Sequence, residues 1–199
     1  MTRQSEAIHQ KLRGTLESPP SVRRILFTMR APSVTRVNLA ILKILLSERK
    51  DRGIYLTVDR PEKHVITLLE KHNLAAPSEV SAVPEPRPRK IVIAQGIFSP
   101  AIFIDDMFTR LGDPQAGPAL DAEIRTMNFL MVDNLSTLNA YNGPKGIDAC
   151  FAHLAMFLDR YRSIRFVAAA GRESLTALGA GARSFFDTEV GLPDEWLAE

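Results

Sequence analysis

The chain has 199 residues, a formal net charge of +2, and 45% hydrophobic and 24% charged residues. This length suits one domain over residues 1–199, and the composition lies close to globular averages, which argues against a disordered or fibrous protein. No apolar run approaches the roughly 20 residues that cross a bilayer. The polar start carries no apolar signal-peptide core, so we expect a cytoplasmic protein without a membrane span.

Cysteine content and charge distribution exclude further classes. The single cysteine, Cys150, cannot form an intrachain disulfide, and we expect it in the core. A net charge of +2 argues against a nucleic-acid partner. The charge is uneven, because the N-terminal extension 1–22 and the first strand are mainly basic, whereas every charge after Arg183, including the tail 192–199, is acidic. The two ends would attract one another, within one chain or between subunits, unless they are simply solvated, which we favour.

Strand and helix patterns alternate along the chain. Strands are predicted at 24–29, 54–58, 90–94, 128–132 and 164–169, and helices at 34–48, from Pro61, at 100–111 and over 147–161. Ser33 or Thr35 would cap the helix at 34–48, and the proline-rich segment 77–88 is expected to be a connecting loop. The alternation predicts a three-layer α/β/α fold with a mainly parallel central sheet.

Chemistry in such a sheet belongs in the loops after the carboxyl ends of the strands. The first of these loops, residues 30–37, occupies the position of a phosphate-binding loop, G-x-x-x-x-G-K-[ST]. Asp59 follows the second strand, and Asp133 follows the apolar run 128–132.

Four segments carry a resemblance that covers nearly the whole chain. Residues 35–42 are similar to the helix start after a phosphate loop, 53–59 to a second strand with an acidic end, 131–138 to a Walker B strand, and 185–192 to a late strand. In this order and spacing they resemble the RecA superfamily, especially its KaiC-like and RadA-like members. The resemblance implies a RecA-like core and ATP with Mg²⁺ as cofactors.

The phosphate loop departs from the pattern of that superfamily. Arg30 and Thr35 stand in place of its two glycines, Arg36 in place of its lysine, and Val37 in place of the hydroxyl that holds Mg²⁺, while Pro32 removes an amide. The departures predict weak or absent nucleotide binding and no hydrolysis. Arg36, a permanent cation at a helix start, would still be able to hold an anion. The candidate phosphate-contacting residues are Arg30, Ser33, Thr35, Arg36 and Val37.

Two carboxylates are the candidates for catalysis. Asp133 would position a metal, although we favour a structural role inherited from the fold. Asp59 would polarise water, or cap the helix that begins near Pro61. Asp105 and Asp106 are expected on a solvated helix face.

Three functions compete. The first is a non-hydrolysing regulatory, signalling or scaffold protein that acts through protein partners, such as an active RecA/KaiC-like paralogue or a second copy of itself. Its tail offers Trp196 and Leu197 as a docking anchor, unless Trp196 packs on its own domain. The second is an atypical ATPase that uses Arg36 and Asp133. The third is a DNA-recombination accessory that binds DNA through its basic N-terminal region.

Overall fold

A seven-stranded parallel sheet forms the centre of the computed structural model, which describes residues 3–75, 79–81, 90–95, 100–175, 178 and 180–193. The strands are β1 (Arg24–Met29), β2 (Gly53–Thr57), β3 (Val80–Ser81), β4 (Ile91–Gln95), β5 (Phe129–Val132), β6 (Arg165–Gly171) and β7 (Thr188–Gly191). Their order is β3-β4-β2-β5-β6-β1-β7, and every neighbouring pair is parallel.

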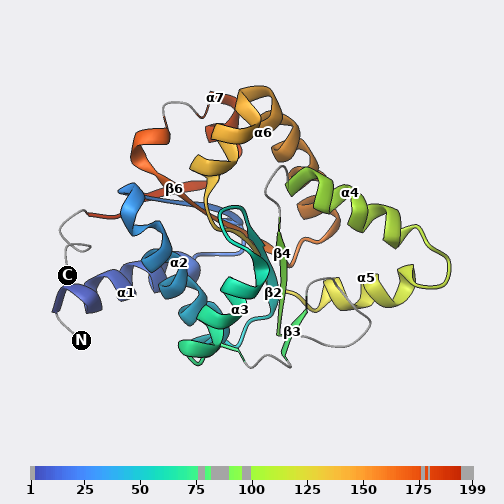
Figure 1. Ribbon diagram of the computed structural model, residues 1–199, viewed down its shortest axis with the longest axis horizontal. Coiled ribbons are helices and arrows are strands. Elements are labelled where there is room, and N and C mark those ends of the chain that lie inside the picture. The colour runs from blue at the N-terminus through green and yellow to red at the C-terminus, as the bar shows by residue number, and fades with distance from the viewer. Residues whose placement is uncertain are drawn as a thin grey trace.

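Helices cover both faces of the sheet. They are α1 (Arg3–Leu16), α2 (Val34–Lys43), α3 (Glu62–Lys71), α4 (Pro100–Leu111), α5 (Gly117–Arg125), α6 (Leu135–Arg160) and α7 (Ala180–Ser184), with short turns η1 (Ala31–Ser33), η2 (Ile44–Glu48) and η4 (Arg172–Ser174). Successive strand residues point to opposite faces, so Ile25 and Phe27 pack with α1, α2 and α3, whereas Leu26 packs with α4, α5, α6 and α7. Figure 1 shows these two groups of helices on opposite sides. The three-layer α/β/α prediction is therefore confirmed.

Several predicted elements keep their bounds and others change. The strand at 24–29 and the helix at 100–111 form as predicted, and the helix expected over 34–48 is α2 followed by the wider turn η2. The two-residue strand β3 forms inside the segment 77–88, which we expected to be a loop, because it pairs with β4. Helix α6 begins well before the predicted stripe, and it bends at Gly143, whose φ of 65° suits glycine.

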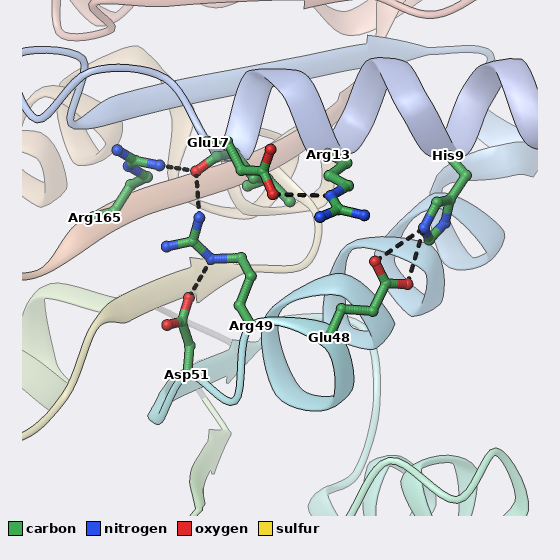
Figure 2. A network of polar contacts seen from close by, with 8 residues as sticks. His9, Arg13, Glu17, Glu48, Arg49, Asp51 and Arg165 are labelled. Atoms are coloured by element: carbon green, nitrogen blue, oxygen red, sulfur yellow. Dashed lines mark hydrogen bonds and ion pairs between the residues drawn. The ribbon is translucent and has the colours of Figure 1, made fainter.

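Helices α1, α5 and α7 were not predicted. Helix α1 lies in the N-terminal extension and is mostly polar, but Leu12 and Leu16 are fully buried in the same hydrophobic cluster as the apolar residues of β1 and α2. At its end, the backbone carbonyl of Leu16 accepts hydrogen bonds from Arg49 and from Arg165 (Figure 2). The apolar signal of α1 is thus too sparse to stand out in the sequence, and tertiary contacts hold the helix in place.

The opposite charges of the two ends meet within the chain at one point. Arg24 Nη2 lies 2.6 Å from Asp187 Oδ1, and Asp187 Oδ2 accepts the backbone N–H groups of Arg23 and Arg24 at 2.8 Å each. Attraction within one chain therefore accounts for this pair, which we had expected to be solvated. Trp196 and Leu197 lie outside the described residues.

Within the described ranges, no helix combines the length and the apolar character that crossing a bilayer requires. Cys150 is buried in the core beside α4, as expected. Asp105 and Asp106 are exposed on α4, and Asp105 Oδ1 lies 2.6 Å from His153 Nδ1.

Candidate site at the carboxyl edge of the sheet

Asp133 is buried directly after β5, where its side chain is 3% exposed. Its Oδ1 accepts the backbone N–H of Val58 at 2.8 Å, and its Oδ2 lies 2.9 Å from Thr57 Oγ1. Burial raises the pKa of Asp133 to about 6, although these two hydrogen bonds act in the opposite direction. The carboxyl group therefore ties the end of β5 to the end of β2.

A second contact joins Asp133 to α2. The side-chain amide of Asn38, which is buried, donates from Nδ2 to the backbone carbonyl of Asp133 at 2.7 Å. This bond fixes the second turn of α2 against the end of β5. Asn38 therefore helps to position the loop between β1 and α2, although no sequence motif pointed to it.

Asp59 is exposed and belongs to a different contact. It accepts a hydrogen bond from Asn134 Nδ2 at 2.6 Å, while Asn134 Oδ1 accepts the backbone N–H groups of Ser136 and Thr137 and so caps α6. The helix-cap interpretation of Asp59 is wrong, because the N-cap position of α3 is Pro61 and no side chain accepts a capping hydrogen bond there. Asp59 instead accepts a hydrogen bond from Asn134 and so helps to hold the side chain that caps α6.

The loop after β1 closes as the tight turn η1. Ser33 donates its backbone N–H to Arg30 O at 2.9 Å, Val34 donates to Ala31 O, and Pro32 has no N–H. Three consecutive positions of the loop therefore offer no free amide to a ligand. A phosphate loop works by aiming such amides inward, and this backbone geometry does not provide them.

The side chains of the loop divide between interior and surface. Ser33 and Val37 are buried, whereas Arg30 and Arg36 are exposed. Neither proposed cap of α2 operates as predicted, because Ser33 occupies the N-cap without a side-chain hydrogen bond. Thr35 Oγ1 accepts a hydrogen bond from the guanidinium of Arg60 instead, which links the start of α2 to the turn after β2.

The residues present do not fit the ATP and Mg²⁺ that the resemblance to the RecA superfamily implies. The amides at 32–34 are absent or paired, Val37 has no hydroxyl, and both oxygens of Asp133 accept hydrogen bonds from the end of β2. In the part of the chain that the structure describes, no three His, Cys, Asp or Glu side chains gather as a metal site requires.

Two solved structures show where this architecture has been seen. A KaiC-like protein from the hyperthermophilic archaeon Pyrococcus horikoshii has a TM-score of 0.57 and 12% identity, with 85% of this chain and 70% of that chain covered. The fold is that of KaiC-like proteins. The flagellar accessory protein FlaH from Methanocaldococcus jannaschii has a TM-score of 0.55 and 9% identity, with 91% of this chain and 76% of that chain covered. No protein-family model and no curated protein matches the sequence.

The structure brings some of the predicted residues together and leaves others apart. Asp59 and Asp133 end neighbouring segments, and Arg60 joins the second of the sheet's loops to Thr35. Sequence reasoning missed the polar residues that connect these loops: Asn38, Thr57, Arg60, Asn134 and Ser136. Asn134 was the detectable member, because an asparagine two residues before Ser136 at a strand end is a helix-capping signal.

Proposed function

We propose that this chain is a cytoplasmic, RecA/KaiC-like regulatory or scaffold protein that does not hydrolyse nucleotides and acts by binding protein partners. The observation that carries the proposal is the backbone pairing of the loop after β1, where Ser33 and Val34 donate their N–H groups to Arg30 and Ala31. These two N–H groups would become available to a phosphate only if the turn η1 before α2 were lost.

The chemistry of phosphoryl transfer supports the same conclusion. Transfer depends on positioning the phosphates and on neutralising their charge with lysine, arginine and magnesium. Both oxygens of Asp133 already accept hydrogen bonds from the end of β2, and these bonds compete with a metal ion for the carboxylate. Val37 adds no oxygen where the superfamily pattern has a hydroxyl.

The experiment is a calorimetric titration of the purified chain with ATP and ADP, with and without Mg²⁺, together with a steady-state hydrolysis assay. We expect no binding below about 1 mM and no turnover above background. Tight binding that disappears in Arg36→Ala would make the chain a nucleotide sensor. Turnover that Asp133→Asn abolishes would establish an atypical ATPase and overturn the proposal.

The partner-binding part of the proposal rests on the acidic tail and needs its own test. Leu192 is 1% exposed, and its backbone N–H donates to Thr28 O at 2.8 Å, so it belongs to the folded core. A truncation after Pro193 therefore removes Trp196 and Leu197 without cutting into that core. One occupant is a second copy of the chain, as in a homo-oligomer, and another is an active paralogue.

Sedimentation velocity of the full chain, of the truncated chain and of Trp196→Ala gives the readout for self-association. We expect the full chain to assemble and both variants to sediment as smaller species. Assembly that is unchanged after truncation would contradict a docking role for the tail. Circular dichroism of the truncated chain controls for loss of folding.

A further inference from the structure

Four arginines surround a hollow at the opposite, amino edge of the sheet. The hollow has a volume of about 220 Å³ and lies where β1, β5 and β6 begin. Arg23, Arg49, Arg162 and Arg165 line it, together with the polar residues Asn128 and Ser163. Among the described residues, its lining contains no carboxylate. We refer to these four arginines and the space between them as the arginine hollow.

Two of the four guanidinium groups are held in place by the fold. Arg165 donates to Leu16 O and, at 2.8 Å, to Ser18 O, while Arg49 donates to Leu16 O at 3.0 Å and to Asp51 Oδ2 at 2.6 Å. Figure 2 shows Arg49 and Arg165 pointing toward the same end of α1. Each guanidinium carries five N–H donors, so each retains donors for a ligand after these contacts.

The other two arginines add further charge. One nitrogen of Arg23 lies within hydrogen-bond distance of Leu158 O, at 2.5 Å, and of two more carbonyls near the end of α6, while its buried Nε has no hydrogen-bond partner. Arg162 is exposed, and the structure gives it no hydrogen bond or ion pair with the described residues. It is therefore the arginine whose donors are most available.

The positive charges disfavour one another in the protein alone. Burial lowers the pKa of Arg165, and the neighbouring charge of Arg49 lowers it further. Burial is the main cause that lowers the pKa of Arg23, and the nearby charges act in both directions, since Asp159 and Asp187 raise it whereas Arg24 and Arg162 lower it. The nearby carboxylates of Asp51, Asp159 and Asp187 are fewer than the guanidinium groups, because Arg24 adds to the four of the hollow. A bound anion would relieve this repulsion and satisfy the remaining donors.

We propose that the arginine hollow binds the phosphate group of a small molecule. Guanidinium forks match the tetrahedral oxygens of phosphate and hold them by paired hydrogen bonds, and several converging forks favour a dianion over a single carboxylate. The hollow accommodates a compact group of this kind, and Asn128 and Ser163 supply neutral polar groups at its wall. This site is separate from the loop after β1, so it stands whether or not the proposed function does.

The test is a calorimetric titration of the full chain at low ionic strength. Inorganic phosphate is the ligand in one series, and ribose 5-phosphate is the ligand in the second. We expect binding with a Kd below about 1 mM, weakened about tenfold or more in Arg162→Ala. Arg162→Lys keeps the positive charge but loses the paired donors of the guanidinium group. Its affinity for phosphate should therefore lie between those of the wild type and Arg162→Ala. Stronger binding of ribose 5-phosphate would identify the source as a phosphorylated metabolite rather than free phosphate.

Arg36→Ala is the matched control, because it removes an exposed arginine from the carboxyl edge. Binding that survives Arg36→Ala and falls in Arg162→Ala supports the arginine hollow. No binding below about 1 mM overturns the proposal, and so does equal binding by both variants. Loss of binding in Arg36→Ala alone would also overturn it and would move the anion site to the loop after β1.

Discussion

The two edges of the sheet use their polar residues in opposite ways. At the carboxyl edge, Asp133 and the amides of the loop after β1 are paired within the fold. At the amino edge, guanidinium groups outnumber the carboxylates that pair with them, and Arg162 has no hydrogen bond or ion pair with the described residues. At the edge that normally holds ligands in parallel sheets, the carboxylate of Asp133 and the loop amides are thus paired, and Asn38 Oδ1 is a buried acceptor without a hydrogen-bond partner among the described residues, whereas the other edge carries unused donors.

This difference shows that topology and chemistry are separable. The fold places four loops at the carboxyl edge whatever their residues are, but only free donors and charges make a site there. The structural role that we favoured for Asp133 agrees with its hydrogen bonds. Four predictions test this contrast, and the one with the greatest expected loss of stability comes first.

Removing the carboxyl group of Asp133 should be the most destabilising change. Asp133→Ala leaves the buried Val58 N–H without its partner and removes one of the two acceptors near the Thr57 hydroxyl, whose other acceptor is Arg60 O, at a cost of about 3 kcal/mol in the free energy of unfolding. Asp133→Asn should cost little, because its amide accepts from Val58 and donates to Thr57. Urea unfolding measures both, and Asp59→Ala is the exposed control. Equal loss in the Ala and Asn variants would point to a need for negative charge.

The pH dependence of stability should reveal the same group. Its folded pKa of about 6 lies above the ordinary 3.8, so its contribution is full below that ordinary value and is lost as the pH rises through 6. Relative to Asp133→Asn, the wild type should gain about 2 kcal/mol from about pH 7 to about pH 4. Urea midpoints across this range provide the measurement. A constant difference would contradict the raised pKa.

At the amino edge, Asp187 should behave with the opposite sign. Burial raises the pKa of Asp187, but hydrogen bonds from Arg24 and from two backbone amides together lower it, so its contribution is lost as the pH falls. Asp187→Ala should cost about 2 kcal/mol near neutral pH. The exposed Glu189→Ala is the control, measured by the same urea unfolding. A cost no greater than that of the control would show that the pair between the two ends contributes nothing.

The smallest effect on folding should come from Arg162→Ala. Arg162 is exposed and has no partner among the described residues, so its removal should change the free energy of unfolding by less than about 0.5 kcal/mol. Thermal unfolding checks this value. A large loss would mean that Arg162 supports the fold, and its effect on phosphate binding would then need a second variant.

Local patterns predicted the sheet better than they predicted the helices. Buried apolar runs such as 24–29 and 128–132 mark strands, because a parallel sheet is covered on both faces. Helix α1 escaped notice because it buries few apolar side chains and depends on Arg49 and Arg165 from distant segments. The capping roles of Ser33, Thr35 and Asp59 failed for a similar reason, since long-range partners or backbone bonds decided their contacts.

Local periodicity and residue identity are enough to predict the α/β class, the five main strands with α2, α3, α4 and α6 between them, and the altered residues of the loop after β1. The pairing of the amides in that loop is evident only in the folded structure, and the link that Asp133 makes between β5 and β2 depends on contacts between distant segments. The same holds for the four arginines, far apart in the chain, that surround one hollow. Such contacts arise where separate strands end side by side, and no short stretch of sequence encodes them.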